Sequence, residues 1–250
     1  MLLRSVMKHV KDQNWTAVAL DFMIVVVGVF IGIQVSNWNA ARGERALERV
    51  YLERLHDEAF AGVNGFLEST DIIWTMRRNA MHAAYDVIFD NDEGTPSLDP
   101  DQCSALANTH SIIAYPHQFP SLEELISSGR FGIIQDADLR EKLTGYVLMQ
   151  KNSRNLVDFY TAGNLNMALE FPDYFQTRLA YGGTFRVEGF GVRCYPELMH
   201  EDQRFMNSLT EAVSRFNSYY NLVLRREIDS VKAIHAKLDA LLQIDHGEDQ

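Results

Sequence analysis

A run of apolar residues near the N-terminus constrains the fold of this chain more than any other feature. Residues 17–35 read AVALDFMIVVVGVFIGIQV, with Trp15 just before them and Trp38 just after. A helix rises about 1.5 Å per residue, so the two tryptophans would lie roughly 35 Å apart. That is close to the separation of the two bilayer interfaces, where Trp side chains concentrate. The sequence therefore predicts a transmembrane helix over residues 15–38, with Trp15 and Trp38 at the membrane interfaces and a short cytoplasmic tail over residues 1–14.

A cleaved signal peptide and a buried core helix are the alternatives to a membrane anchor. Arg4, Lys8 and Lys11 supply the basic start that a signal peptide needs. After the apolar run, however, Trp38 stands where a cleavage site requires small residues. The pattern favours an uncleaved anchor in a lipid bilayer over both alternatives.

The orientation of the anchor follows from weaker signals. Basic residues flank both ends of the apolar run, and those on the C-terminal side alternate with glutamates, so the positive-inside rule alone does not decide. The chain has two cysteines, Cys103 and Cys194. An even pair can form one disulfide in a domain outside the cytosol, and we expect this pair to do so; the alternative is that both are reduced and buried. We expect the N-terminus in the cytoplasm and the following domain in the periplasm, at a bacterial inner membrane.

The predicted anchor has one face of small residues. Gly28 and Gly32 form a G-x-x-x-G pattern, Ser36 extends it by one turn, and Asp21 lies seven residues before Gly28 on roughly the same side. Small residues let two helix backbones approach closely in lipid. We interpret this face as a seam against another membrane helix, either a second copy or a different protein. Asp21 is then buried in the seam, or it stays hydrated near the interface.

The rest of the chain has the periodicity of helices. Apolar residues recur at three- and four-residue spacings over three long stretches, residues 40–87, 139–167 and 205–241. Gly62 and Gly65 predict a kink or break in the first stretch. Residues 181–195 are the exception and predict a small β-hairpin that turns at residues 188–191. The predicted fold is all-α: a transmembrane helix continues into a helical-bundle domain over residues 39–245, and residues 246–250 form a disordered tail.

Local signals mark several helix ends. Ser121, followed by Glu124, predicts a capping box, and Gly129 predicts a left-handed end for the same short helix. Acids or hydroxyls suited to the N-cap stand before two other helices, at Asp99 or Ser97 and at Asp136 or Asp138.

No residue pattern identifies a chemical reaction. The net charge of −11 argues against a nucleic-acid partner, which needs clustered basic surface, so we expect none. No nucleotide, hydrolase, zinc-protease or C-x-x-C motif occurs. His110 and His117 read as loop or packing residues, and His56, Asp57 and Glu58 as a solvated helix face. We therefore expect no catalytic residue, no cofactor, no metal ion and no enzyme activity.

Two segments carry a family resemblance. Residues 19–39, ALDFMIVVVGVFIGIQVSNWN, run into the charged stretch RALERVYLERL at residues 45–55. Together with LISSGR at residues 125–130, and with Leu139, Arg140 and Leu143, they resemble an uncharacterised family of bacterial single-pass membrane proteins, a domain of unknown function. In that family the anchor ends in a Q-V-S-N-W-N-like motif. The resemblance implies architecture and bacterial origin, but no activity.

These features together predict a membrane-anchored helical interaction or scaffold protein, accessory to a membrane assembly. Two alternatives remain from other classes. One is a periplasmic sensor that binds a small ligand between its helices. The other is a subunit of an ion-driven membrane machine that uses Asp21.

Overall fold

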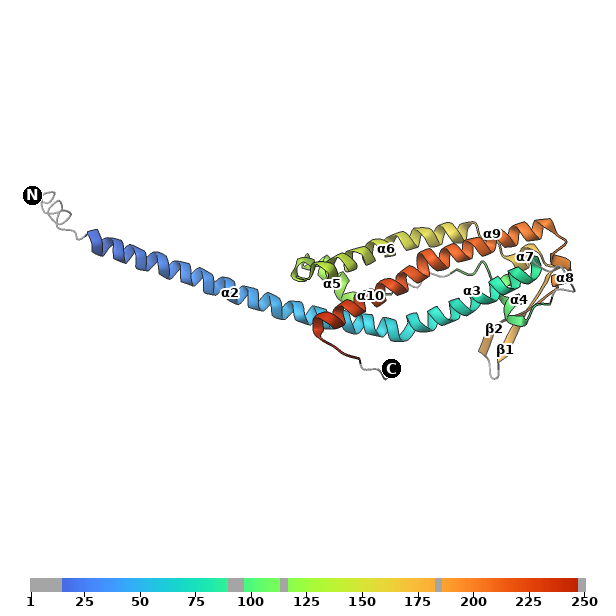
Figure 1. Cartoon of the computed structure of the whole chain (residues 1–250), viewed down its shortest axis with the longest axis horizontal. Coiled ribbons are helices and arrows are strands. Elements are labelled where there is room, and N and C mark those ends of the chain that lie inside the picture. The colour runs from blue at the N-terminus through green and yellow to red at the C-terminus, as the bar shows by residue number, and fades with distance from the viewer. Residues whose placement is uncertain (1–14, 90–96, 113–116, 183–185, 247–250) are drawn as a thin grey trace, which may run out of the picture. The chain divides into compact units, whose positions relative to one another are not determined.

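The computed structural model describes residues 15–89, 97–112, 117–182 and 186–246 (Figure 1). The expected cytoplasmic tail at residues 1–14 and the last four residues of the expected disordered tail lie outside this part. The chain divides into two compact units, Met1–Tyr51 and Leu52–Gln250. The first unit is formed by the N-terminal part of α2 (Trp15–Ala61). Side chains at residues 22–40 are all exposed, and this helix is long and apolar enough to cross a membrane.

The second unit is built on three long helical rods. The end of α2 continues through the π-helical segment η1 (Gly62–Leu67) into α3 (Glu68–Phe89). The second rod is α6 (Ala137–Ala162). The third is α9 (Gln203–Tyr219), which passes through the π-helical η3 (Tyr220–Leu224) into α10 (Arg225–Leu242). In Figure 1, α10 packs along α6, and α9 packs against both α3 and α6. The all-α prediction is confirmed.

The break predicted in the first rod is confirmed at Gly65, whose φ of −120° and ψ of −105° leave the helical region. The three apolar stripes meet in one core. Each large apolar side chain removed from water contributes about 1.5–3 kcal/mol before the entropy cost of ordering it. Fully buried members from the three rods include Leu55, Met81, Leu139, Leu143, Phe205, Leu209, Phe216, Ile228, Ile234 and Leu238.

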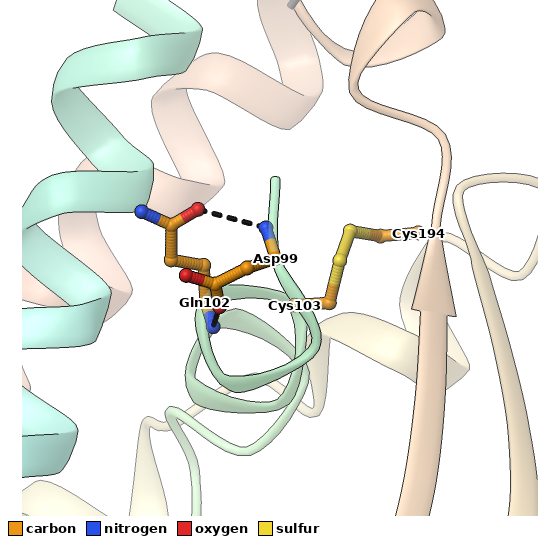
Figure 2. The surroundings of a disulfide bond; sticks show 4 residues. All are labelled: Asp99, Gln102, Cys103 and Cys194. Atoms are coloured by element: carbon orange, nitrogen blue, oxygen red, sulfur yellow. Dashed lines mark hydrogen bonds between the residues drawn. A yellow bond between two sulfur atoms is a disulfide. The ribbon is translucent and has the colours of Figure 1, made fainter. Parts of the chain in front are cut away.

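Short helices cover the loops between the rods: α4 (Pro100–Ala107), α5 (Pro120–Ser127), the 3-10 turn η2 (Phe131–Ile133), α7 (Met167–Glu170) and α8 (Pro196–Met199). Asp99 caps α4 in a reciprocal capping box with Gln102 (Figure 2), and Asp136 caps α6. Gly129 follows α5 with a φ of +71°, as predicted.

The capping box predicted at Ser121 is wrong. Helix α5 begins at Pro120, and its N-cap, Phe119, has no side-chain hydrogen bond. The N–H and hydroxyl of Ser121 instead donate to the carboxylate of Glu58, at 3.1 and 2.6 Å. A carboxylate from α2 thus satisfies the positive end of α5.

The predicted hairpin is present, but its turn is placed wrongly. Strand β1 (Phe175–Gly182) pairs antiparallel with β2 (Arg186–Cys194). The residues expected to turn lie inside β2, where Gly191 pairs with Arg178 and Gly189 with Ala180. Gly189 and Gly191 are therefore paired strand residues and not turn residues. A Cβ at Gly191 would lie 3.4 Å from Cγ of Arg178.

Candidate functional site

The residues of the predicted anchor seam lie on α2 within the first unit. Gly28, Gly32 and Ser36 follow one another at one-turn spacing, so they share a face. A Cβ added at Gly28 or Gly32 would meet nothing within 4 Å. Trp38 is 58% exposed. Trp15 and Asp21 also lie on α2, but their side chains are outside the described part, so the expectation for Asp21 stays a prediction.

Cys103 and Cys194 form a disulfide that joins α4 to the end of β2 (Figure 2). Their Cα atoms lie 5.6 Å apart, although 91 residues separate them in sequence. Cys103 follows the capped N-terminus of α4, and both capping residues are drawn beside it in Figure 2. The disulfide ties the hairpin to the helical part of the second unit.

A cleft of about 430 Å³ opens between α3 and α4, beside the segment that follows α4. Among the described residues that line the cleft, Arg77 is the one cation. Asp101, Ser104 and Ser111 also line it. The guanidinium donates to the carbonyl of Ser111 at 3.1 Å and stacks over Trp74, 4.9 Å from the ring centroid. Burial lowers the pKa of Arg77 to about 10, so it remains charged at neutral pH.

A buried polar node fixes the segment before α5 between α6 and α10. The backbone N–H of His117 donates to Glu227 on α10 at 2.6 Å. Its carbonyl accepts from the Tyr146 hydroxyl at 2.7 Å and from the Gln150 amide at 2.6 Å, both on α6. Burial raises the pKa of Glu227 to about 6, and the hydrogen bonds from His117 and Tyr146 oppose that rise. The node involves only the backbone of His117; its ring packs beside Gly62 and Phe119 and is also hydrogen-bonded to the backbone of Glu58.

His110 is half-buried beside Asn166. Its ring nitrogen Nε2 lies 3.2 Å from the side-chain amide of Asn166, and burial lowers its pKa.

Four residues with metal-ligating side chains converge at another place in the second unit. They are His56 on α2, His235 and Asp239 on α10, and His246 beyond the end of α10, and we call them the histidine cluster. Their ligand atoms all lie within 4.8 Å of one another. The solvated position predicted for His56 is wrong, because this side chain is buried, whereas Asp57 beside it is exposed as expected.

Asp239 is the centre of the histidine cluster. Its Oδ1 lies 3.0 Å from Nε2 of His56 and 2.9 Å from Nε2 of His246. Its Oδ2 lies 3.4 Å from Nδ1 of His235. Burial lowers the pKa of His235, and Asp239 raises it.

A left-handed residue returns the chain to the cluster. Helix α10 ends at Leu242, and Gln243 has a φ of 58°. The N–H groups of Gln243 and Ile244 both donate to the carbonyl of Asp239. The backbone thus reverses, and His246 comes back beside the carboxylate of the same residue. His246, expected at the start of a disordered tail, therefore has defined contacts.

Sequence reasoning missed the cluster because its members are spread over three segments. One signal was present: His235 and Asp239 stand four residues apart, so two ligand types share one helix face. His56 and His246 join them only in the folded structure, where α2 lies beside α10 and the chain reverses after α10.

Comparison of the chain with protein-family models, curated proteins and solved structures finds no match.

Proposed function

We propose that the chain is a membrane-anchored interaction or scaffold protein, an accessory component of a membrane assembly, whose anchor packs against another membrane helix. The observation that carries this proposal is the exposed apolar segment of α2. Residues 22–35 have no covering side chains within the described part, while the second unit has a complete core of its own. A segment this apolar needs lipid or a partner helix around it.

The small-residue face supports a partner helix in addition to lipid. Open space at Gly28 and Gly32 permits close backbone approach from outside the chain. In lipid, such approach gains van der Waals contact that larger side chains prevent.

The disulfide supports a periplasmic position for the second unit, because disulfides persist in oxidising compartments and are rare in the cytosol. The proposal that this membrane is a bacterial inner membrane is based on the family resemblance alone.

A cysteine scan tests the seam. Cys103 and Cys194 are first replaced by serine. Single cysteines are then placed along residues 22–36, and disulfide cross-links are formed in native membranes. We expect cross-linking to peak at residues 28, 32 and 36 with a helical period. The mass of the product distinguishes a second copy from a different protein. A flat profile would contradict the seam.

The cleft at Arg77 favours a second candidate, sensing of a small anionic ligand between helices. A half-enclosed cation beside hydroxyl groups is the type of site that binds carboxylate or phosphate. A thermal-shift screen of small anions tests it. A hit must lose its effect in Arg77→Met and keep it in Arg130→Met, which changes an exposed arginine.

A further inference from the structure

The histidine cluster has the donor set of a late transition metal. It offers three imidazoles and one carboxylate, from His56, His235, His246 and Asp239. Zn²⁺ is held in proteins by this mixture of nitrogen and oxygen ligands, whereas Mg²⁺ and Ca²⁺ take oxygen ligands throughout. Both cysteines of the chain are in the disulfide, so thiolate ligands are excluded.

The spacing of the donor atoms suits one ion. Metal–ligand bonds of about 2.0–2.1 Å in a tetrahedron place neighbouring donor atoms roughly 3.3 Å apart. Oδ1 of Asp239 lies 3.0 Å from Nε2 of His56 and 2.9 Å from Nε2 of His246, and the other oxygen, Oδ2, lies 3.4 Å from Nδ1 of His235. The four ligand atoms lie within 4.8 Å of one another, so the wider pairs would have to close by up to about 1.5 Å around an ion.

The surroundings of the cluster also resemble those of a metal site. Nδ1 of His56, the nitrogen turned away from Asp239, lies 3.3 Å from the carboxylate of Asp57. Ligating histidines commonly donate their second N–H to such a carboxylate, which fixes the tautomer. Phe60 stacks on His246 with ring centroids 5.2 Å apart and gives the cluster an apolar wall.

The cluster without an ion is poorly satisfied. One carboxylate serves three imidazoles, whose ring centroids lie only 5.1–5.5 Å apart. Gln243 holds a left-handed conformation that costs a non-glycine residue free energy. A bound ion would offset these costs, because it binds all four side chains at once.

We propose that His56, His235, Asp239 and His246 bind one Zn²⁺ ion, which holds the segment after α10 against α2 and α10. Four protein ligands leave no open position, which is typical of structural rather than catalytic zinc. The ion would stabilise the folded second unit, since the ligands come together only when α2 and α10 are packed.

Metal titration of the full chain tests the proposal. The protein is purified in detergent micelles without a polyhistidine tag, stripped with a chelator, and titrated with Zn²⁺ against a chromophoric chelator. We expect one Zn²⁺ per chain and no competition from Mg²⁺ or Ca²⁺. Co²⁺ in its place should show the visible d–d bands of four-coordinate geometry.

Variants locate the ion. His246→Ala changes a residue outside every helix, so the bundle should stay folded, and the Zn²⁺ affinity should fall at least about tenfold. His235→Ala should have the same effect. His200→Ala, an exposed histidine outside the cluster, is the matched control and should bind as the unaltered chain does. Hydrogen exchange at residues 243–246 should slow on addition of Zn²⁺ in the unaltered chain only.

Two results would overturn the proposal. One is the absence of stoichiometric Zn²⁺ uptake by the unaltered chain. The other is equal affinity in the unaltered chain, His246→Ala and His235→Ala, which would mean that zinc binds elsewhere on the surface.

Discussion

The backbone N–H of His117 donates to Oε1 of Glu227 across 2.6 Å, although 110 residues separate them in sequence. This bond brings the segment before α5 into the interface of α6 and α10, where the buried carboxylate also accepts a longer hydrogen bond, 3.3 Å, from the Tyr146 hydroxyl. The carboxylate is only 4% exposed, so its protonation is coupled to folding.

Stability should therefore depend on pH through Glu227. Its pKa is about 6 in the folded chain against an ordinary value of 4.5. The folded state binds more protons between these values, so stability is highest below pH 4.5 with respect to this group and falls as the pH rises through 6. At about 1.4 kcal/mol per pKa unit, the loss is about 2 kcal/mol.

Glu227→Gln should remove this dependence, because the amide oxygen still accepts from His117 but does not titrate. Urea unfolding of both chains from pH 4 to pH 7.5 measures it. The difference in unfolding free energy, unaltered chain minus variant, should fall by up to about 2 kcal/mol across the range. A difference that stays constant would contradict the assigned pKa.

Gly62→Ala should destabilise the chain. The added Cβ would lie 2.6 Å from Cε1 of His117, whose ring packs edge-on against Phe119 at a centroid distance of 4.7 Å. Overpacking of this kind costs about 1–3 kcal/mol.

Gly145→Ala is the matched control for Gly62→Ala. Gly145 lies within α6, and a Cβ there meets nothing within 4 Å. The Gly145→Ala substitution should raise the free energy of unfolding by about 0.5–1 kcal/mol, because alanine favours the helical conformation more than glycine does. His117→Ala should restore most of the stability lost in Gly62→Ala, and a double-mutant cycle without coupling would refute the contact.

Removal of the disulfide should also reduce stability. In the chain-entropy argument, a closed loop of this length constrains the unfolded chain by roughly 4 kcal/mol. A Cys103→Ser/Cys194→Ser chain should unfold at lower urea concentration than the oxidised protein. Reductant should bring the unaltered chain to the same midpoint and leave the double variant unchanged. Equal midpoints under oxidising conditions would show that the bond does not form.

Local patterns allowed much of the fold to be predicted from the sequence. The three rods follow from apolar spacing, and the ends of α4 and α5 follow from Asp99 and Gly129, because these signals act over one or two turns. Gly62 and Gly65 gave a local signal for the break, because two glycines close together weaken a helix, whereas the single Gly145 leaves α6 unbroken.

Long-range contacts account for what sequence reasoning missed. Ser121 looked like an N-cap, but Glu58, which lies 63 residues away, competes for its hydroxyl. His56 follows the charge pattern of a solvated face, and only its distance of 3.0 Å from Asp239 shows that it is enclosed. No local pattern contains either contact, because both depend on how the rods pack.

The side of the membrane that carries the second unit can be measured directly. A C-terminal alkaline phosphatase fusion should be active, because this enzyme folds only outside the cytoplasm. A C-terminal green fluorescent protein fusion exported by the general secretion route should be dark. The opposite pair of results would place the second unit, with its disulfide, in the cytoplasm and contradict the proposed orientation.

The proposed seam on α2 should respond to side-chain volume at Gly28 and Gly32 and not at neighbouring positions. Gly28→Ile or Gly32→Ile would separate the packed backbones and should reduce co-purification of the partner helix several-fold. Val27→Ile and Phe30→Leu, on other faces of the same helix, should leave it near the unaltered level. Asp21→Asn keeps the shape and removes the charge, so a buried seam should survive it. Loss of ion transport by an assembly that still forms in Asp21→Asn would instead support the ion-driven alternative. If all four apolar substitutions act alike, the segment is an anchor without a specific face.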